Sequence, residues 1–362
     1  GASSLDPEYL TLLHRYKFME LLLGALLFSW FVHSVLYVPF IRLLYQIKFQ
    51  RLTQVTRDAF DKRTPLFDKF HKHKAGTPVG GGLLIIVLTT CMVPLVLLLM
   101  HYFWVPITSV YPLRAELKVL LFTFVSFGLL GLLDDVKKTF AWVKGGFFGL
   151  RLRHKLILEI ALASLIGYWL VAELKISIFH IPLIGVVQMG WWYIPFAAFV
   201  IIAFANAFNI TDGLDGLSSG VLTISLFAFW FMSASILDTV LSTFIALWVG
   251  GVLAFLYFNI FPSRIFLGDV GALSFGATFA VVGLILGKVP ALIIIGGVFV
   301  IEVGSSLIQL VSRSVFHRKA FVAAPFHLWL QAKGWPEPKI VMRFWIMSII
   351  FAVFGLWLAL LA

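Results

Sequence analysis

Long, nearly uninterrupted apolar blocks restrict the fold of this chain more than any other feature. With 61% hydrophobic and only 12% charged residues, the 362-residue chain carries too little charge to cover the surface of a soluble protein. A helix needs about 20 apolar residues to cross a membrane, whereas the strands of a membrane barrel alternate in polarity. We therefore predict an all-α polytopic membrane protein with about ten spanning helices. The spans are expected at residues 18–40, 79–103, 116–133, 156–173, 192–208, 217–236, 239–258, 271–287, 290–312 and 341–361.

Basic residues gather in alternate connections between these spans, after the first, third and ninth. Because lysine and arginine are retained on the cytoplasmic side, the pattern predicts that the odd-numbered loops are cytoplasmic and that both termini lie outside. The net charge of +11 is then a topology signal, and nucleic acid is not expected as a partner. Segment 173–191 alternates weakly and predicts a short external hairpin. Residues 1–362 are interpreted as one membrane domain, with a short N-terminal segment at 1–17 and a tag remnant at 1–4.

One polar stretch, residues 206–217, lies between two of the apolar blocks. Its polar side chains recur every third residue, which would put them on one face of a helical turn: Asn206, Asn209, Asp212 and Asp215. Such a face is costly in an apolar chain unless it binds something polar. Gly213 and Gly216 would let a ligand approach the backbone closely.

Three further acids follow apolar runs directly. Asp134 and Asp135 end the third span, and Asp269 lies between Gly268 and Val270-Gly271. Carboxylates of this kind suit Mg²⁺, which usually keeps waters and takes substrate phosphates as further ligands. The alternatives are a solvated helix end for the pair and a helix cap for Asp269. Phe266 offers an apolar ring to a base or sugar.

Two loops add cationic and imidazole groups. The glycine-rich segment 74–82 begins with Lys74 and would offer backbone N–H groups to an anion, unless it is only a turn at a span end. His327 lies in the last basic loop, where a lone histidine is more often structural than catalytic. All these clusters fall in odd-numbered loops or at their mouths, which favours a single cytoplasmic site. The carboxylates and lysines suit a Mg²⁺-bridged pyrophosphate, and the membrane location favours a lipid as one substrate.

These motifs resemble the polyprenyl-phosphate N-acetylhexosamine-1-phosphate transferase superfamily from about residue 70 to the end of the chain. The resemblance rests on segments 206–217, 134–135, 266–271 and 76–81, and segment 333–345 is closest to the branch that transfers phospho-MurNAc-pentapeptide. It implies a Mg²⁺-dependent enzyme of the bacterial inner membrane. The implied substrates are UDP-MurNAc-pentapeptide and undecaprenyl phosphate, with lipid I and UMP as products. Exposed apolar span faces would also support a homodimer.

The resemblance also implies roles for single residues. Asp269 would be the principal Mg²⁺ ligand, and Asp134 and Asp135 would serve the lipid phosphate, with Asp134 as the candidate base. His327 would complete the catalytic set. The remaining positions would bind substrate: Lys74, Lys138 and Lys155 at the phosphates, and Asn206, Asn209, Asp212, Gly213, Asp215 and Phe266 around the nucleoside.

The chain departs from this branch in its last loop. The branch usually reads Ala-Pro-x-His-His-His-x-Glu, whereas here Leu328, Trp329 and Gln331 follow His327, and Glu159 stands where glutamine is usual. A sister enzyme that transfers a GlcNAc-type 1-phosphate therefore stays an alternative. An ion-coupled transporter is an alternative of another class, and it predicts acids near the middle of the membrane.

Overall fold

The computed structural model describes residues 7–50, 74–140 and 152–361, and side chains from residue 16 onward. The tag remnant expected at 1–4 lies outside the described residues, as do parts of the first and third basic loops. The fold is almost entirely helical, and ten of the described helices are long and apolar enough to span a membrane. The elements are α1 (Pro7–Gln46), α3 (Gly81–Tyr102), α4 (Leu113–Phe140), α5 (Leu152–Ala172), β1 (Ile178–Ile181), β2 (Gly185–Gln188), α6 (Tyr193–Thr211), α7 (Leu217–Ser235), α8 (Thr239–Asn259), α9 (Gly268–Ile285), α10 (Val289–Ile295), α11 (Gly297–Val315), α12 (Phe326–Ala332) and α13 (Glu337–Leu360).

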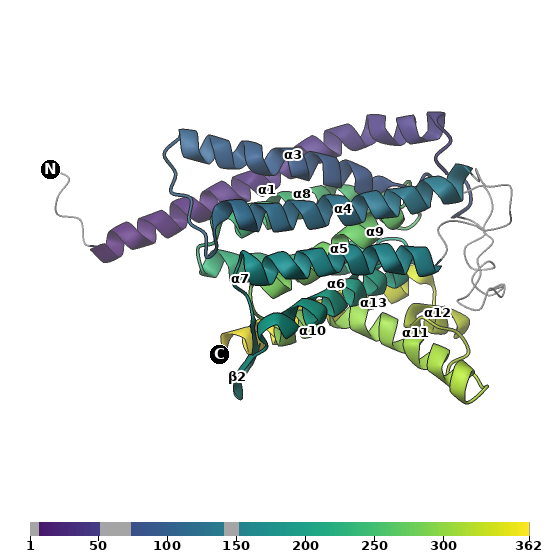
Figure 1. The fold of residues 1–362 in the computed structure, drawn as a ribbon. Coiled ribbons are helices and arrows are strands. Elements are labelled where there is room, and N and C mark those ends of the chain that lie inside the picture. Colours follow the sequence, from purple (N-terminus) through teal and green to yellow (C-terminus); the bar gives the residue numbers. More distant parts are fainter. Residues whose placement is uncertain (1–6, 51–73, 141–151, 362) are drawn as a thin grey trace.

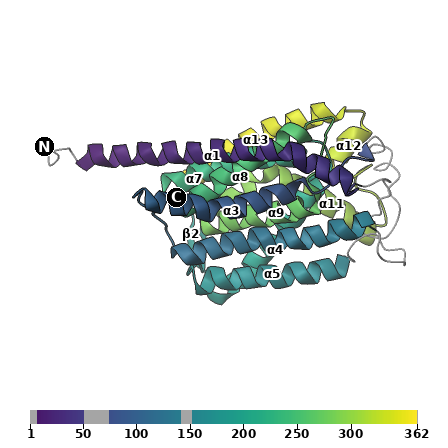
Figure 2. The ribbon, with the colours of Figure 1, turned by 90° about the horizontal axis from the view of Figure 1, so that it is seen from above.

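Helix α9 forms the centre of the bundle, and all of its 18 residues are buried. It packs against α3, α4 and α6, while α8 packs against α1, α3 and α7. The helices α1, α3, α4 and α5 lie side by side in chain order (Figure 2). Small residues recur every fourth position along α9, at Gly268, Ala272, Gly276 and Ala280, and such a stripe lets neighbouring backbones approach closely.

Glycines let α3 and α4 approach the start of α9 closely. A Cβ on Gly131 of α4 would lie 2.0 Å from the Asp269 carbonyl oxygen, and a Cβ on Gly82 of α3 would lie 2.3 Å from the Gly271 Cα. The N–H groups of Gly81 and Gly82 donate to the carbonyls of Phe266 and Leu267, at 2.8 and 3.0 Å. The expectation that this turn offers its backbone to an anion is therefore wrong for these two residues. Because glycine has no side chain, α3 can pack closely against the start of α9 at these two residues.

Gly131→Ala is expected to destabilise the protein by about 1–3 kcal/mol, because the new methyl group has no room against the α9 backbone. Gly24→Ala is the matched control, since a Cβ at this position of α1 meets nothing within 4 Å. Thermal unfolding in detergent compares the two variants. Equal melting temperatures for both would show that α4 and α9 lie farther apart than this contact requires.

The ninth predicted span, residues 290–312, is divided into two helices. The division falls at Gly296, between α10 and α11, and only α11 is long enough to span. Figure 1 shows α11 diverging from the bundle toward α12. Its polar residues Glu302, Ser305, Gln309 and Ser312 are buried. They share one stripe, so α11 is not a uniformly apolar helix.

The other predicted spans are confirmed with shifted ends, and α1 extends well beyond the predicted 18–40 at both ends. The predicted hairpin at 173–191 is also confirmed, since β1 and β2 pair antiparallel with Ile181 opposite Gly185. The N-terminal end of α1 and the C-terminal end of α13 lie at one end of the bundle, and α12 lies at the other (Figure 1). The side of the membrane on which each end lies stays a prediction.

Candidate active site

Four charged side chains from three helices meet at the α12 end of the bundle. The Lys138 ammonium lies 2.9 Å from Asp134 Oδ2 and 2.5 Å from Asp269 Oδ2. The Lys155 ammonium lies 3.5 Å from the same two oxygens. We call these four residues the ion cluster. Both acids are largely buried, so the lysines offset charges that water solvates poorly.

Asp135, the neighbour of Asp134 in the chain, contacts the start of α9. Its Oδ2 accepts a hydrogen bond of 3.0 Å from the Val270 N–H, in the first turn of α9. Gly268 has a φ of +79°, and a Cβ there would lie 2.6 Å from this carboxylate oxygen. Asp135 on α4 therefore caps the N-terminus of α9, and this contact stabilises the position of Asp269 in the first turn of α9.

The ion cluster has the donor chemistry that Mg²⁺ prefers. The carboxyl groups of Asp134 and Asp269 lie within hydrogen-bonding reach of each other. Two carboxylates this close repel each other, and a cation bound by both would relieve the repulsion. Within the described residues, no group of three or more His, Cys, Asp or Glu side chains is arranged to hold a metal alone. Mg²⁺ does not need one, since one or two carboxylates with waters and substrate phosphates suffice. Asp269, with Asp134 beside it, fits this arrangement.

The polar stretch 206–217 does not form a single helical face. Asn206 and Asn209 lie on α6, which ends at Thr211, and Asp212 follows as its C-terminal cap. The Asp212 carboxylate accepts a 2.5 Å hydrogen bond from the Ser218 hydroxyl at the start of α7. The Asn206 side chain donates to Glu159 Oε2 at 2.7 Å. Asn206 is therefore turned toward α5, where Glu159 is buried.

Lys74, expected at the phosphates, instead belongs to a second buried ion group. Its ammonium lies 2.8 Å from Asp215 Oδ1 and 2.7 Å from Glu337 Oε1. The other Asp215 oxygen accepts the Ser263 N–H at 3.0 Å. This group joins the glycine-rich turn, the central motif and the start of α13. In this conformation Lys74 and Asp215 are engaged with protein atoms, and their expected roles at substrate stay predictions.

His327 is held by an acid from the ninth span. Its Nδ1 lies 2.9 Å from Glu302 Oε2, and its backbone N–H donates to Glu302 Oε1 at 3.2 Å. The other ring nitrogen, Nε2, is buried and has no hydrogen-bond partner among the described residues. It faces Gly213, where a Cβ would lie only 2.6 Å away. Gly213 thus leaves room for the imidazole beside the central motif.

The residues that replace the usual histidines and glutamate fold into α12. Leu328 and Gln331 are buried, and the Trp329 ring packs under the Lys333 ammonium at 3.7 Å from the ring centre. The aromatic and aliphatic substitutions in α12 are therefore accommodated by packing.

Phe266 is half-buried, and its backbone N–H donates to the Pro78 carbonyl at 2.9 Å.

Three residues without a role in the sequence analysis prove to organise the site: Glu302, Glu337 and Asn259. Asn259, at the end of α8, accepts from the Gly216 N–H at 3.1 Å and from the Ser219 hydroxyl at 3.0 Å. Glu302 already stands out in the sequence as an acid within a span, and Glu337 as the acid of the 334–338 loop. Nothing local to Asn259 marks it.

The Asp212 carboxyl has a perturbed acidity. Burial raises its pKa to about 7, with a further rise from Asp269 and Asp135, against lowering by the Ser218 hydrogen bond and Lys74. An acid whose pKa is raised on folding contributes stability that is fully present below its unfolded pKa of 3.8 and is lost as pH rises toward 7.

The melting temperature of the wild type should therefore fall relative to that of Asp212→Asn as pH rises from about 4 to about 8. Thermal unfolding in metal-free detergent measures this difference. Asp212 is partly exposed, so the effect is expected to be a few degrees. A difference that stays constant or grows in favour of the wild type would contradict the raised pKa.

Comparisons with known proteins identify the family of the chain. The family described as glycosyl transferase family 4 matches residues 117–287. The phospho-N-acetylmuramoyl-pentapeptide-transferase of Rickettsia felis is 34% identical over 309 residues, which cover 79% of this chain and 80% of the relative. The protein of the same name from Thermodesulfovibrio yellowstonii is 32% identical over 374 residues, which cover 96% of each chain. The chain therefore belongs to the phospho-N-acetylmuramoyl-pentapeptide-transferase family and is a membrane phosphoglycosyl transferase.

Proposed function

We propose that this enzyme transfers phospho-MurNAc-pentapeptide from UDP-MurNAc-pentapeptide to undecaprenyl phosphate, with Mg²⁺ as cofactor. An oxygen of the lipid phosphate attacks the phosphorus next to the sugar, the pyrophosphate P–O bond breaks, and UMP leaves, so that lipid I is formed. The ion cluster carries the proposal. Its two lysines and two acids lie together at a bundle end, where a lipid phosphate and a soluble nucleotide can both arrive.

Each residue of the ion cluster has its own proposed role at the phosphates. Asp269, with Asp134 beside it, would hold Mg²⁺, which would neutralise charge on the pyrophosphate oxygens. Lys138 and Lys155 contact both acids. When substrate binds, their ammonium groups are placed to bind phosphate oxygens instead of the carboxylates. Asp134 is the candidate to accept a proton from the lipid phosphate. Asp135 keeps α9 in position through Val270.

The remaining residues orient the donor. Asn209, Asp212 and Phe266 are proposed to line the nucleoside pocket. His327 presents Nε2 beside Gly213, while Glu302 holds its other nitrogen. This orientation suits a hydrogen bond to the sugar or pyrophosphate of the donor. We further propose that the site faces the cytoplasm of the bacterial inner membrane, as the charge pattern of the loops predicts.

A second donor, a UDP-GlcNAc-type sugar nucleotide, is favoured by one observation. Only His327 remains of the histidine run, and Leu328 and Gln331 are buried in α12 rather than offered to a ligand. The transporter alternative is not supported, because the acids of the sequence motifs lie at or near helix ends rather than in mid-helix: Asp134, Asp212, Asp215 and Asp269.

UMP release by the purified protein with Mg²⁺ and undecaprenyl phosphate tests the proposal. Turnover with UDP-MurNAc-pentapeptide and none with UDP-GlcNAc is the expected result. Turnover with UDP-GlcNAc alone would assign the sister reaction. If folded protein released no UMP from either donor, the proposed activity would be wrong.

A further inference from the structure

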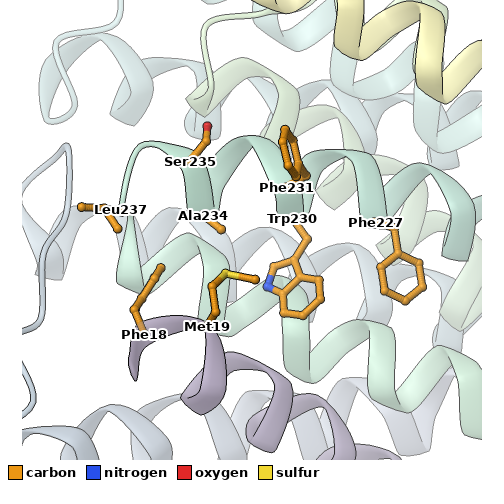
Figure 3. A pocket seen from close by; sticks show the side chains of 8 residues that line it. All are labelled: Phe18, Met19, Phe227, Trp230, Phe231, Ala234, Ser235 and Leu237. Atoms are coloured by element: carbon orange, nitrogen blue, oxygen red, sulfur yellow. The ribbon is translucent and has the colours of Figure 1, made fainter. Parts of the chain in front are cut away.

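A pocket of about 460 Å³ lies between α1 and α7, at the end of the bundle away from the ion cluster. Phe18 and Met19 come from the start of the apolar part of α1, and the opposite wall comes from the last turns of α7. Figure 3 shows the side chains of the two helices facing one another across this space. The principal lining residues are Phe18, Met19, Phe227, Trp230, Phe231 and Leu237.

The pocket opens on a surface suited to lipid. Phe227 and Phe231, one turn apart on α7, are 41% and 57% exposed, and Met19 is 39% exposed. Such a rim of exposed apolar side chains on two spanning helices would meet acyl chains rather than water. The interior wall is different, because Phe18 and Trp230 are buried. The shape therefore suits an apolar chain that enters from the side.

One polar group in the pocket lacks a partner. The Trp230 side chain is only 7% exposed, and its Nε1–H has no hydrogen-bond partner among the described residues. Figure 3 shows the indole nitrogen directed across the pocket toward Met19. A buried indole N–H usually finds an acceptor, and in hydrocarbon an unmade bond is costly. The ligand should therefore carry an acceptor next to an apolar chain.

The depth of Trp230 identifies that acceptor. Helix α7 has 19 residues and at about 1.5 Å per residue is about as long as the hydrocarbon core is thick. Trp230 lies five residues before its end at Ser235, or about 7 Å inside it. The ester carbonyls of a phospholipid lie at the edge of the hydrocarbon core, so they are the lipid acceptors nearest to this depth that adjoin an acyl chain.

We propose that the α1–α7 pocket binds one acyl chain of a phospholipid and that the Trp230 N–H donates to its ester carbonyl. The site is separate from the ion cluster and does not depend on the proposed reaction. Ether-linked phospholipids have the same head groups and chains but lack the carbonyl, so they isolate the hydrogen bond.

Purified protein is loaded with equal amounts of ester- and ether-linked phosphatidylethanolamine of the same chain length, and the bound lipids are compared by native mass spectrometry. The wild type should retain the ester lipid about two- to tenfold more, which is the range of one net hydrogen bond. Trp230→Phe should abolish the preference and leave ether-lipid binding unchanged. Trp357→Phe, at an exposed tryptophan of α13, should behave as the wild type.

A phosphatidylethanolamine with a diazirine in its acyl chain tests the location. Adducts are expected on the first turns of the apolar part of α1 and on the last turns of α7, and Ala234→Trp, which fills the pocket, should remove them. Adducts only elsewhere would overturn the site. Equal retention of ester and ether lipids by the wild type would overturn the hydrogen bond and leave water as the partner of Trp230.

Discussion

Asp269→Asn should abolish Mg²⁺-dependent UMP release, with kcat reduced by about three orders of magnitude or more. The substitution removes one negative charge and almost no volume. Lys138, 2.5 Å from Asp269, keeps its 2.9 Å contact with Asp134, so the variant should fold. The helix cap from Asp135 to Val270 is also untouched. The loss should persist over the whole Mg²⁺ titration, because a carboxylate ligand is missing rather than weakened.

Glu173→Gln is the matched control for this change. Glu173 pairs with Lys118 beyond the far end of α5, where both side chains are about one third exposed, so the same acid-to-amide replacement should leave UMP release unchanged. Thermal unfolding of each variant checks that it is folded. Wild-type turnover by Asp269→Asn at any Mg²⁺ concentration would remove Asp269 from the site.

His327→Ala should lower kcat by about 100-fold or more, the usual contribution of a positioned acid or base. The substitution removes the Nε2 that faces Gly213 and leaves the buried Glu302 carboxylate without its side-chain partner. Glu302→Gln should cost less, about 10- to 100-fold, because the amide can still accept from the His327 backbone but no longer carries the charge beside Nδ1.

The double variant separates positioning from a merely structural effect. If Glu302 acts through His327, then His327→Ala with Glu302→Gln should be no slower than His327→Ala alone. The KM of the donor should change less than kcat in each case. Full kcat in His327→Ala would show that the histidine is dispensable, and multiplied losses in the double variant would show that Glu302 acts independently.

Most of the fold was predictable from local sequence. The apolar blocks predicted ten spans, and the weak alternation around Pro182 and Gly185 predicted the hairpin of β1 and β2. The ends of spans were less accurate, and the break at Gly296 was missed. The residues on either side of Gly296 are all apolar, so hydropathy is the same for one helix or two.

The candidate site was predictable as a set of residues but not as an arrangement. Sequence motifs selected Asp134, Lys138, Lys155 and Asp269, and the structure brings these together. The motifs did not predict that Asp135 would cap α9, nor that Lys74 would pair with Glu337, which lies 263 residues away in the chain.

The difference has a physical origin. In lipid every backbone polar group must bond within its own segment, so helices form wherever an apolar block is long enough, and the sequence of that block is sufficient to predict them. The direction of each side chain depends on the rotation of its helix against its neighbours. That rotation follows from close contacts such as Gly131 against the Asp269 backbone and Gly82 against Gly271. Only the packed bundle decides, therefore, that Asp134 faces the lysines, that Asp135 faces α9 and that Glu302 holds His327.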